Sequence, residues 1–198
     1  MKNLILSLLM ILVMCPMQAC SDDNNDTTTD EEQTDQQLQG NSNILVVYFS
    51  QSGKTRGVAE RIAELTGADT YRILAADPYE GDGYPDSERI QDEAYNDKRP
   101  AVANLPDNLD DYDTIFVGTP IWWHYPAMVV CTFLDNYDFK EKTVIPFCTY
   151  DATTWMLQTI DKIKELTPES THMKEFGSSG STANVESWLK EIGIISNP

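Results

Sequence analysis

The feature that most constrains the fold is an unbroken passage, over residues 43–55, from a strand pattern through a turn into a helix. Residues 44–49 read ILVVYF, which is typical of a strand buried on both faces. A helix that begins near Lys54 presents unpaired amide groups and a positive dipole end to the turn, an arrangement that suits a phosphate. Gly53 would let the backbone approach the anion, and nearby hydroxyls would add donors. The stretch reads Ser50, Gln51, Ser52, Gly53, Lys54 and Thr55, of which Ser50, Ser52 and Thr55 carry the candidate hydroxyl donors.

Two other interpretations of this turn are open. Gly53-Lys54-Thr55 matches the end of the triphosphate-binding pattern G-x-x-x-x-G-K-[ST]. That pattern requires glycine at position 48, where this chain has Tyr48, so a loop wide enough for a triphosphate is not expected. The second interpretation is an ordinary strand-to-helix turn in which serine and threonine act as caps. The turn by itself does not separate this interpretation from a phosphate site.

The N-terminus has the pattern of a bacterial lipoprotein signal peptide. Residues 4–13 are apolar and follow Lys2, and the run is shorter than the about 20 residues that a membrane-spanning helix needs. Cys20 follows the small residue Ala19 and is the expected lipidated first residue of the mature chain. Cys15 is a rival cleavage position, and an uncleaved apolar anchor would leave the domain in the same compartment.

A polar, acidic segment follows the cysteine. Residues 21–42 contain no lysine or arginine and a single leucine, so they cannot bury enough apolar surface to fold and are predicted to be a disordered tether. The start of this segment, Ser21-Asp22-Asp23, resembles the acidic signal of surface-displayed lipoproteins of Bacteroidetes. We therefore expect a signal peptide (1–20), a tether (21–42) and one domain (43–198). The domain would be lipid-anchored outside the cytoplasm, at the periplasmic or the cell-surface face of a bacterial outer membrane.

Composition excludes several classes of partner. The formal net charge of −18 at pH 7 would repel nucleic acid, whereas a basic protein partner is compatible with it.

Cys131 and Cys148 stand in apolar surroundings and are expected to be buried free thiols. His124 and His172 are isolated from each other and no C-x-x-C motif is present, so we expect no metal site.

Strand and helix patterns alternate along the domain. Strands are expected at residues 44–49, 70–74, 114–118, 143–148 and 172–176, and helices at 55–66, 87–96, 128–134, 155–166 and 184–192. Five strands separated by helices predict an α/β fold with a parallel sheet covered on both faces. The exception is residues 75–111, rich in proline, glycine and charge, which replace a short crossover by a long excursion beside the sheet. Long connections often carry function.

Ligands of such sheets bind beyond the carboxyl ends of the strands, and three of these ends have unusual sequences here. The first is the turn at 50–55. The third strand is followed by TPIWWH at 119–124, and the fourth ends in TYDATTW at 149–155. A single tryptophan at such a place would usually complete a core. Two tryptophans beside a phosphate site could instead form a wall for a flat ring that carries the phosphate.

Taken together, these loops resemble the flavodoxin family, and more narrowly flavodoxin-like proteins with an S-x-S-G-x-T phosphate loop and a G-x-P-I-W-W second loop. The resemblance extends from residue 44 to residue 194 and includes RP at 99–100, TFL at 132–134, FCT at 147–149 and SWLKEIG at 187–193. It implies a doubly wound, five-stranded parallel sheet of order 2-1-3-4-5 with helices on both faces. It also implies noncovalent binding of FMN, with the phosphate held by residues 50–55.

The resemblance assigns further residues to the flavin. Those expected beside the ribityl chain and one face of the ring are Thr119, Pro120, Ile121 and Trp122, with Trp123 as an additional wall. Those expected at the pyrimidine edge or the other face are Thr149, Tyr150 and Asp151. The third loop departs from the family, in which a glycine-rich sequence usually follows the threonine, so its peptide has less freedom to turn toward a newly protonated flavin nitrogen. His124 also stands where a glycine is common.

The function that this resemblance implies is electron transfer through a bound flavin, with a redox protein or a small-molecule electron acceptor as partner. An FMN-dependent quinone or nitro reductase is the nearest enzymatic alternative. A third interpretation is a binding module that keeps the fold and has lost flavin reactivity. No catalytic residue stands out in the sequence, because no set of side chains for nucleophilic attack or proton relay is evident.

Overall fold

The structure is a computed structural model that describes residues 43–81, 85, 87–107, 109–151 and 155–196. The predicted signal peptide, Cys20 and the predicted tether lie outside the described residues, as do residues 152–154 of the third loop and a few residues of the excursion. In the described part of the chain, no helix has both the length and the apolar character needed to cross a membrane.

The described residues form one seven-stranded sheet in the order β2-β1-β3-β5-β6, in which β7 also pairs with β5 and β4 with β3. All of these pairs are parallel except the β3–β4 pair. The strands are β1 (Ile44–Tyr48), β2 (Asp69–Arg72), β3 (Thr114–Trp122), β4 (Tyr125–Pro126), β5 (Thr143–Thr149), β6 (Thr171–His172) and β7 (Phe176–Ser178). The predicted α/β class with a doubly wound parallel sheet is confirmed. The five predicted strands are present, but the structure adds the short strand β4 and divides the fifth predicted strand into β6 and β7.

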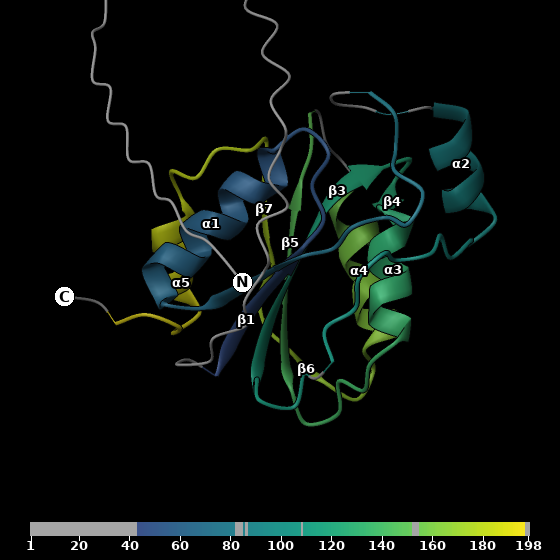
Figure 1. The fold of residues 1–198 in the computed structure, drawn as a ribbon. Coiled ribbons are helices and arrows are strands. Elements are labelled where there is room, and N and C mark those ends of the chain that lie inside the picture. The colour runs from purple at the N-terminus through teal and green to yellow at the C-terminus, as the bar shows by residue number, and fades with distance from the viewer. Residues whose placement is uncertain (1–42, 82–84, 86, 108, 152–154, 197–198) are drawn as a thin grey trace, which may run out of the picture. The chain divides into compact units, whose positions relative to one another are not determined.

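Helices cover both faces of this sheet. Figure 1 shows α1 and α5 on one side and α3 and α4 on the other, with α2 beyond them. The helices are α1 (Lys54–Thr66), α2 (Ser87–Tyr95), α3 (Met128–Asp135), α4 (Met156–Leu166) and α5 (Val185–Glu191). Alternate residues of β1 serve the two layers: Val46 and Tyr48 belong to the core beneath α1 and α5, whereas Leu45 and Val47 belong to the core beneath α3 and α4. This is why the strand is apolar at every position.

The first difference from the predicted strands lies at the end of β3. The strand was predicted to end at Gly118, but it continues to Trp122 and turns back into β4 as a hairpin. The two residues of the hairpin turn, Trp123 and His124, have φ angles of 46° and 74°. Two positive φ values characterise a type I′ turn, which matches the twist of paired strands but normally takes asparagine or glycine. The left-handed backbone costs about 1–3 kcal/mol for each residue that is not glycine.

The second difference is that the predicted fifth strand, residues 172–176, is divided into β6 and β7. The indole Nε1 of Trp188 on α5 donates a hydrogen bond of 3.0 Å to the carbonyl oxygen of Lys174, between the two pieces. This side-chain bond takes up a backbone acceptor that a continuous ladder would use. The second piece, β7, accordingly extends two residues beyond the predicted end at Phe176, to Ser178.

Gly118 leaves room for the ring of Phe147 to pack at the centre of the sheet. A Cβ at this position would lie 2.1 Å from Cζ of Phe147 on β5, and Phe147 is fully buried. We expect Gly118→Ala to lower the free energy of unfolding by about 1–3 kcal/mol, because the ring must move within a packed core. Denaturant titration measures this change.

The matched control for this prediction is Gly57→Ala in α1, where a Cβ would meet no atom within 4 Å. That change should stabilise the protein by about 0.5–1 kcal/mol, because alanine restricts the unfolded chain and favours the helix. A Gly118→Ala variant as stable as the Gly57→Ala variant would show that the contact with Phe147 does not limit packing.

Candidate ligand-binding site

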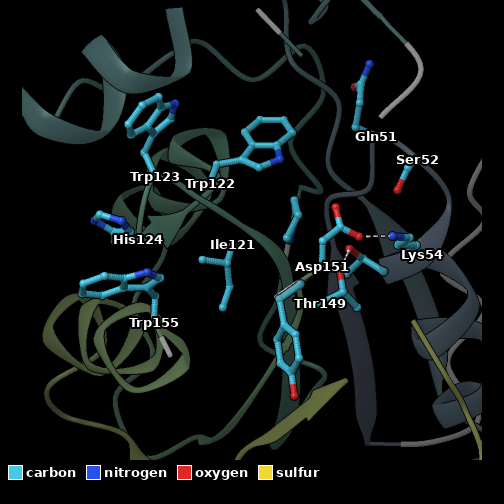
Figure 2. A pocket seen from close by; sticks show the side chains of 13 residues that line it. Gln51, Ser52, Lys54, Ile121, Trp122, Trp123, His124, Thr149, Asp151 and Trp155 are labelled. Carbon is cyan, nitrogen blue, oxygen red and sulfur yellow. Dashed lines mark hydrogen bonds and ion pairs between the residues drawn. The ribbon is translucent and has the colours of Figure 1, made fainter. Parts of the chain in front are cut away.

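A cavity of about 360 Å³ lies beyond the carboxyl ends of β1, β3 and β5 (Figure 2). Its volume falls within the roughly 300–1,000 Å³ that small-molecule sites occupy. All of the predicted binding residues line this cavity except Ser50, Gly53 and Thr119. Their contribution to binding stays a prediction. His124 and Trp155, which were not predicted to bind a ligand, line it as well.

One end of the cavity is suited to an anion. Ser52, Lys54 and Thr55 line it, and Gly53 adopts a φ of 83° just before α1, where no described side chain caps the helix. The Gly57 amide donates to the Gly53 carbonyl over 3.0 Å, so the amides before it have no intrahelical acceptor. Free amides, a positive dipole end and hydroxyls together fit a phosphate group.

Three predicted residues have other or additional contacts. The hydroxyl of Thr119 donates to the Pro120 carbonyl and accepts from the Ala127 amide, each over 2.9 Å, so it holds the β3–β4 hairpin together. The side chain of Gln51 donates to the Tyr79 carbonyl over 3.0 Å and so ties the loop at residues 50–55, called the phosphate loop below after its predicted role, to the excursion at residues 75–111. Ser50 is buried, and its Oγ has no hydrogen-bond partner among the described residues. A buried hydroxyl of this kind is normally paired, so it is available to a ligand that reaches it.

The third loop closes the anion end. Thr149, the last residue of β5, shares a buried hydrogen bond of 2.8 Å with Thr55 through their hydroxyl oxygens. The Tyr150 amide donates to the Ser178 carbonyl over 3.1 Å, which fixes the start of the loop against β7. The next residue, Asp151, makes an ion pair with Lys54 at this end of the cavity (Figure 2). The carboxylate is therefore placed beside the phosphate loop.

Trp122 lines the cavity from within the core. It is 3% exposed and packs edge-to-face against Phe49 and Tyr79, with ring centroids 5.4 and 4.9 Å away. Tyr79 comes from the excursion and donates through its hydroxyl to Glu93 over 2.7 Å. Burial first, and then this hydrogen bond, raise the pKa of Tyr79 far above its usual value. Trp122 therefore has both of the roles considered for it from the sequence, because it completes the core and also borders the cavity.

The opposite end of the cavity is aromatic. Trp155 stacks on His124 with ring centroids 3.8 Å apart and an interplanar angle of 30°. Tyr95 of α2 contacts both His124 and Trp123, at 6.4 and 5.9 Å. We call Tyr95, Trp123, His124 and Trp155 the aromatic rim. Tyr95 and Trp155 are 53% and 44% exposed, so the rim is open to solvent.

Sequence reasoning did not assign His124 and Trp155 to the site. For His124, the available signal was that two bulky residues, Trp123 and His124, form the turn between strand residues. For Trp155 the signal was its place at the end of the third loop. The contact between them depends on how the hairpin packs on α4, where Thr159 donates to the His124 carbonyl over 3.2 Å.

The two cysteines in the described part of the chain, Cys131 and Cys148, do not line the cavity. Both are buried and free, as predicted. Burial is the main cause that raises the pKa of Cys131 and of Cys148 to about 12. Each thiol is therefore protonated at neutral pH and is a poor nucleophile.

The match to known proteins follows the same loops and strands. The family model for flavodoxin matches residues 43–192, which include the whole described sheet and all three loops. The chain belongs to the flavodoxin family. Among curated proteins, no match to this flavodoxin-family chain was found.

Solved structures agree with this membership. A candidate flavoprotein from Bacteroides eggerthii DSM 20697 is 31% identical, with a TM-score of 0.67 over 75% of this flavodoxin-family chain and 96% of its own. A candidate flavoprotein from Bacteroides uniformis ATCC 8492 is 29% identical, with a TM-score of 0.64 over 74% and 97%. A flavoprotein from Lactobacillus acidophilus NCFM, solved in complex with FMN, is 25% identical, with a TM-score of 0.59 over 74% and 98%.

Proposed function

We propose that this chain binds FMN noncovalently and transfers electrons through it. The observation that carries the proposal is one cavity with an anion-binding end and an aromatic end, which is what a flat ring attached to a phosphate requires. The similar flavoprotein from Lactobacillus acidophilus, solved with FMN, supports the same cofactor.

The residues of the cavity fit this cofactor. The phosphate would be held by the amides at the start of α1 and by the hydroxyls of Ser52 and Thr55, and the unpaired Ser50 Oγ is a further candidate donor. Ile121 and Trp122 offer an apolar surface to the ring, and Trp122 is held rigid by its two aromatic neighbours. When bound, FMN would supply redox chemistry at its ring, while the protein supplies binding and orientation.

We also propose that the domain works outside the cytoplasm on a lipid anchor. The support is the signal-peptide pattern of residues 1–20, the cysteine at its end and the acidic tether. A tethered domain could reach either a redox protein in the same membrane or a small electron acceptor.

A second candidate function, an FMN-dependent reductase of quinones or nitro compounds, is favoured by the aromatic rim. Trp155 presents a partly exposed indole at the edge of the cavity, and a planar acceptor could stack there. The His124 ring, which no described residue hydrogen-bonds, could donate a hydrogen bond to an acceptor oxygen.

Removing the two hydroxyls of the phosphate loop tests the cofactor. We expect Ser52→Ala with Thr55→Val to raise the Kd for FMN at least about tenfold, because hydrogen bonds to a charged group contribute roughly 1.5–3 kcal/mol each. The Kd for riboflavin, which lacks the phosphate, should rise by a much smaller factor, which reflects only the loss of the Thr55–Thr149 hydrogen bond. Flavin fluorescence titration of the apoprotein measures both. An equal loss for both flavins would contradict a phosphate site, and a colourless wild type that cannot be reconstituted would favour the flavin-free module.

Turnover with a reduced nicotinamide and a soluble quinone separates the two functions. If the protein is a reductase, we expect steady turnover without a partner protein, and Trp155→Ala should raise KM for the quinone by a larger factor than it raises the Kd for FMN. Leu157→Ala, a change of another exposed apolar side chain just inside α4, serves as the control. Absence of turnover by a flavin-loaded wild type would leave electron transfer to a protein as the function.

The anchor is tested by metabolic labelling with a fatty acid. We expect label on the wild-type chain and on Cys15→Ala, and none on Cys20→Ala, which should leave the membrane fraction. Label that persists on Cys20→Ala and disappears from Cys15→Ala would move the lipidation site to the rival position.

A further inference from the structure

We propose that Lys54 exchanges its partner when a phosphate-bearing ligand enters the cavity. The ammonium group breaks its ion pair with the Asp151 carboxylate and pairs with the phosphate instead. Asp151 would then set how strongly the site prefers a phosphorylated ligand to the same ligand without phosphate. The inference rests on the proposed function, since the phosphate concerned is that of FMN.

The charges around the cavity make this exchange necessary. Among the described residues that line it, Lys54 is the only lysine or arginine and Asp151 is the only carboxylate, and they are paired with each other. A phosphate monoester carries a charge of roughly −1.5 to −2 at neutral pH. It therefore competes with a single carboxylate for the ammonium group, and it does so with help from the start of α1.

The exchange is energetically accessible. The side chains of Lys54 and Asp151 are 44% and 78% exposed. Exposed ion pairs of this kind contribute little to stability, so breaking one costs little. A phosphate at the helix N-terminus offers the ammonium group more charge, and the exposed carboxylate of Asp151 can then be solvated by water where it stands.

Both partners are held in place by neighbours that are independent of the ion pair. Gly180 has a φ of 100°, and a Cβ there would lie only 3.0 Å from Cγ and 3.1 Å from Cβ of Lys54, so this glycine makes room for the lysine stem. On the other side, the bond from the Tyr150 amide to Ser178 fixes the residue before Asp151. The carboxylate is thus kept within reach of the phosphate loop even when the lysine has left it.

Asp151 accordingly opposes phosphate binding in two ways. It competes for Lys54 before the ligand arrives, and it repels the bound dianion afterwards, because like charges raise each other's energy at short range. Neither effect acts on the uncharged ring system of the ligand. The sign of the effect is therefore specific: removing the carboxylate should improve binding of the phosphorylated flavin alone.

The experiment compares FMN with riboflavin on the full chain at low salt. We expect Asp151→Asn to lower the Kd for FMN about threefold, which corresponds to an exposed ion pair that no longer competes. Lys54→Met should raise that Kd about threefold or more. The Kd for riboflavin should stay unchanged in both variants. Asp151→Glu, which keeps the charge, should behave as the wild type, and Asp161→Asn, an exposed aspartate on α4 outside the cavity, controls for net charge.

Two results would overturn the inference. If Asp151→Asn weakens both flavins, the ion pair preorganises the third loop and does not compete with the phosphate. If Asp151→Asn leaves FMN affinity unchanged while Lys54→Met lowers it, the lysine binds phosphate without an exchange. Thermal unfolding of each variant identifies any loss of folding. A wild type that binds neither flavin overturns the proposed function itself, and is distinguished from these results by the wild-type titration alone.

Discussion

The parallel register of β1, β3 and β5 is the constraint on which the rest of the structure depends. Tyr48, Gly118 and Phe147 lie side by side in the three strands. β1 ends at Tyr48, β5 ends two residues after Phe147, and β3 ends four residues after Gly118. The loops that follow must therefore emerge together at one edge of the sheet. Because Gly118 has no side chain, the Phe147 ring can pack directly over the middle strand. The cavity is a consequence of this alignment, since each of its walls is the continuation of one strand.

The excursion gives the second support of the cavity. Its residues Ala75 and Val102 are joined to each other by an antiparallel bridge, and its Tyr79 ring packs against Trp122 of β3. The guanidinium of Arg89 on α2 lies over the ring of this tyrosine, 4.1 Å from its centroid. The Gln51 side chain then links the excursion to the phosphate loop. A segment that looks irregular in sequence thereby fixes both an aromatic wall of the cavity and the loop at residues 50–55.

Local pattern predicted most of the fold, because apolar periodicity reports burial directly. It could not predict the end of β3, where pairing with β4 decides the length of the strand, nor the interruption before Phe176, which depends on a hydrogen bond from Trp188. In the site, the order of the loops placed most residues around one cavity. Among the exceptions, Thr119 is engaged by the β3–β4 hairpin, whose formation the strand pattern did not predict. The addition of Trp155 arises from its contact with His124, a residue distant in sequence, which no local pattern encodes.

The hairpin turn at Trp123 and His124 links stability to the binding surface. Both residues hold a left-handed backbone that glycine would adopt without strain, and both carry rings that form part of the aromatic rim. A glycine in either place would relax the backbone and remove a ring from the edge of the cavity. The native fold is therefore less stable than this topology allows, and the deficit is concentrated in the loop that a ligand would touch. Occupation of the site could recover part of it, because any molecule that packs on these rings favours the strained conformation over its alternatives.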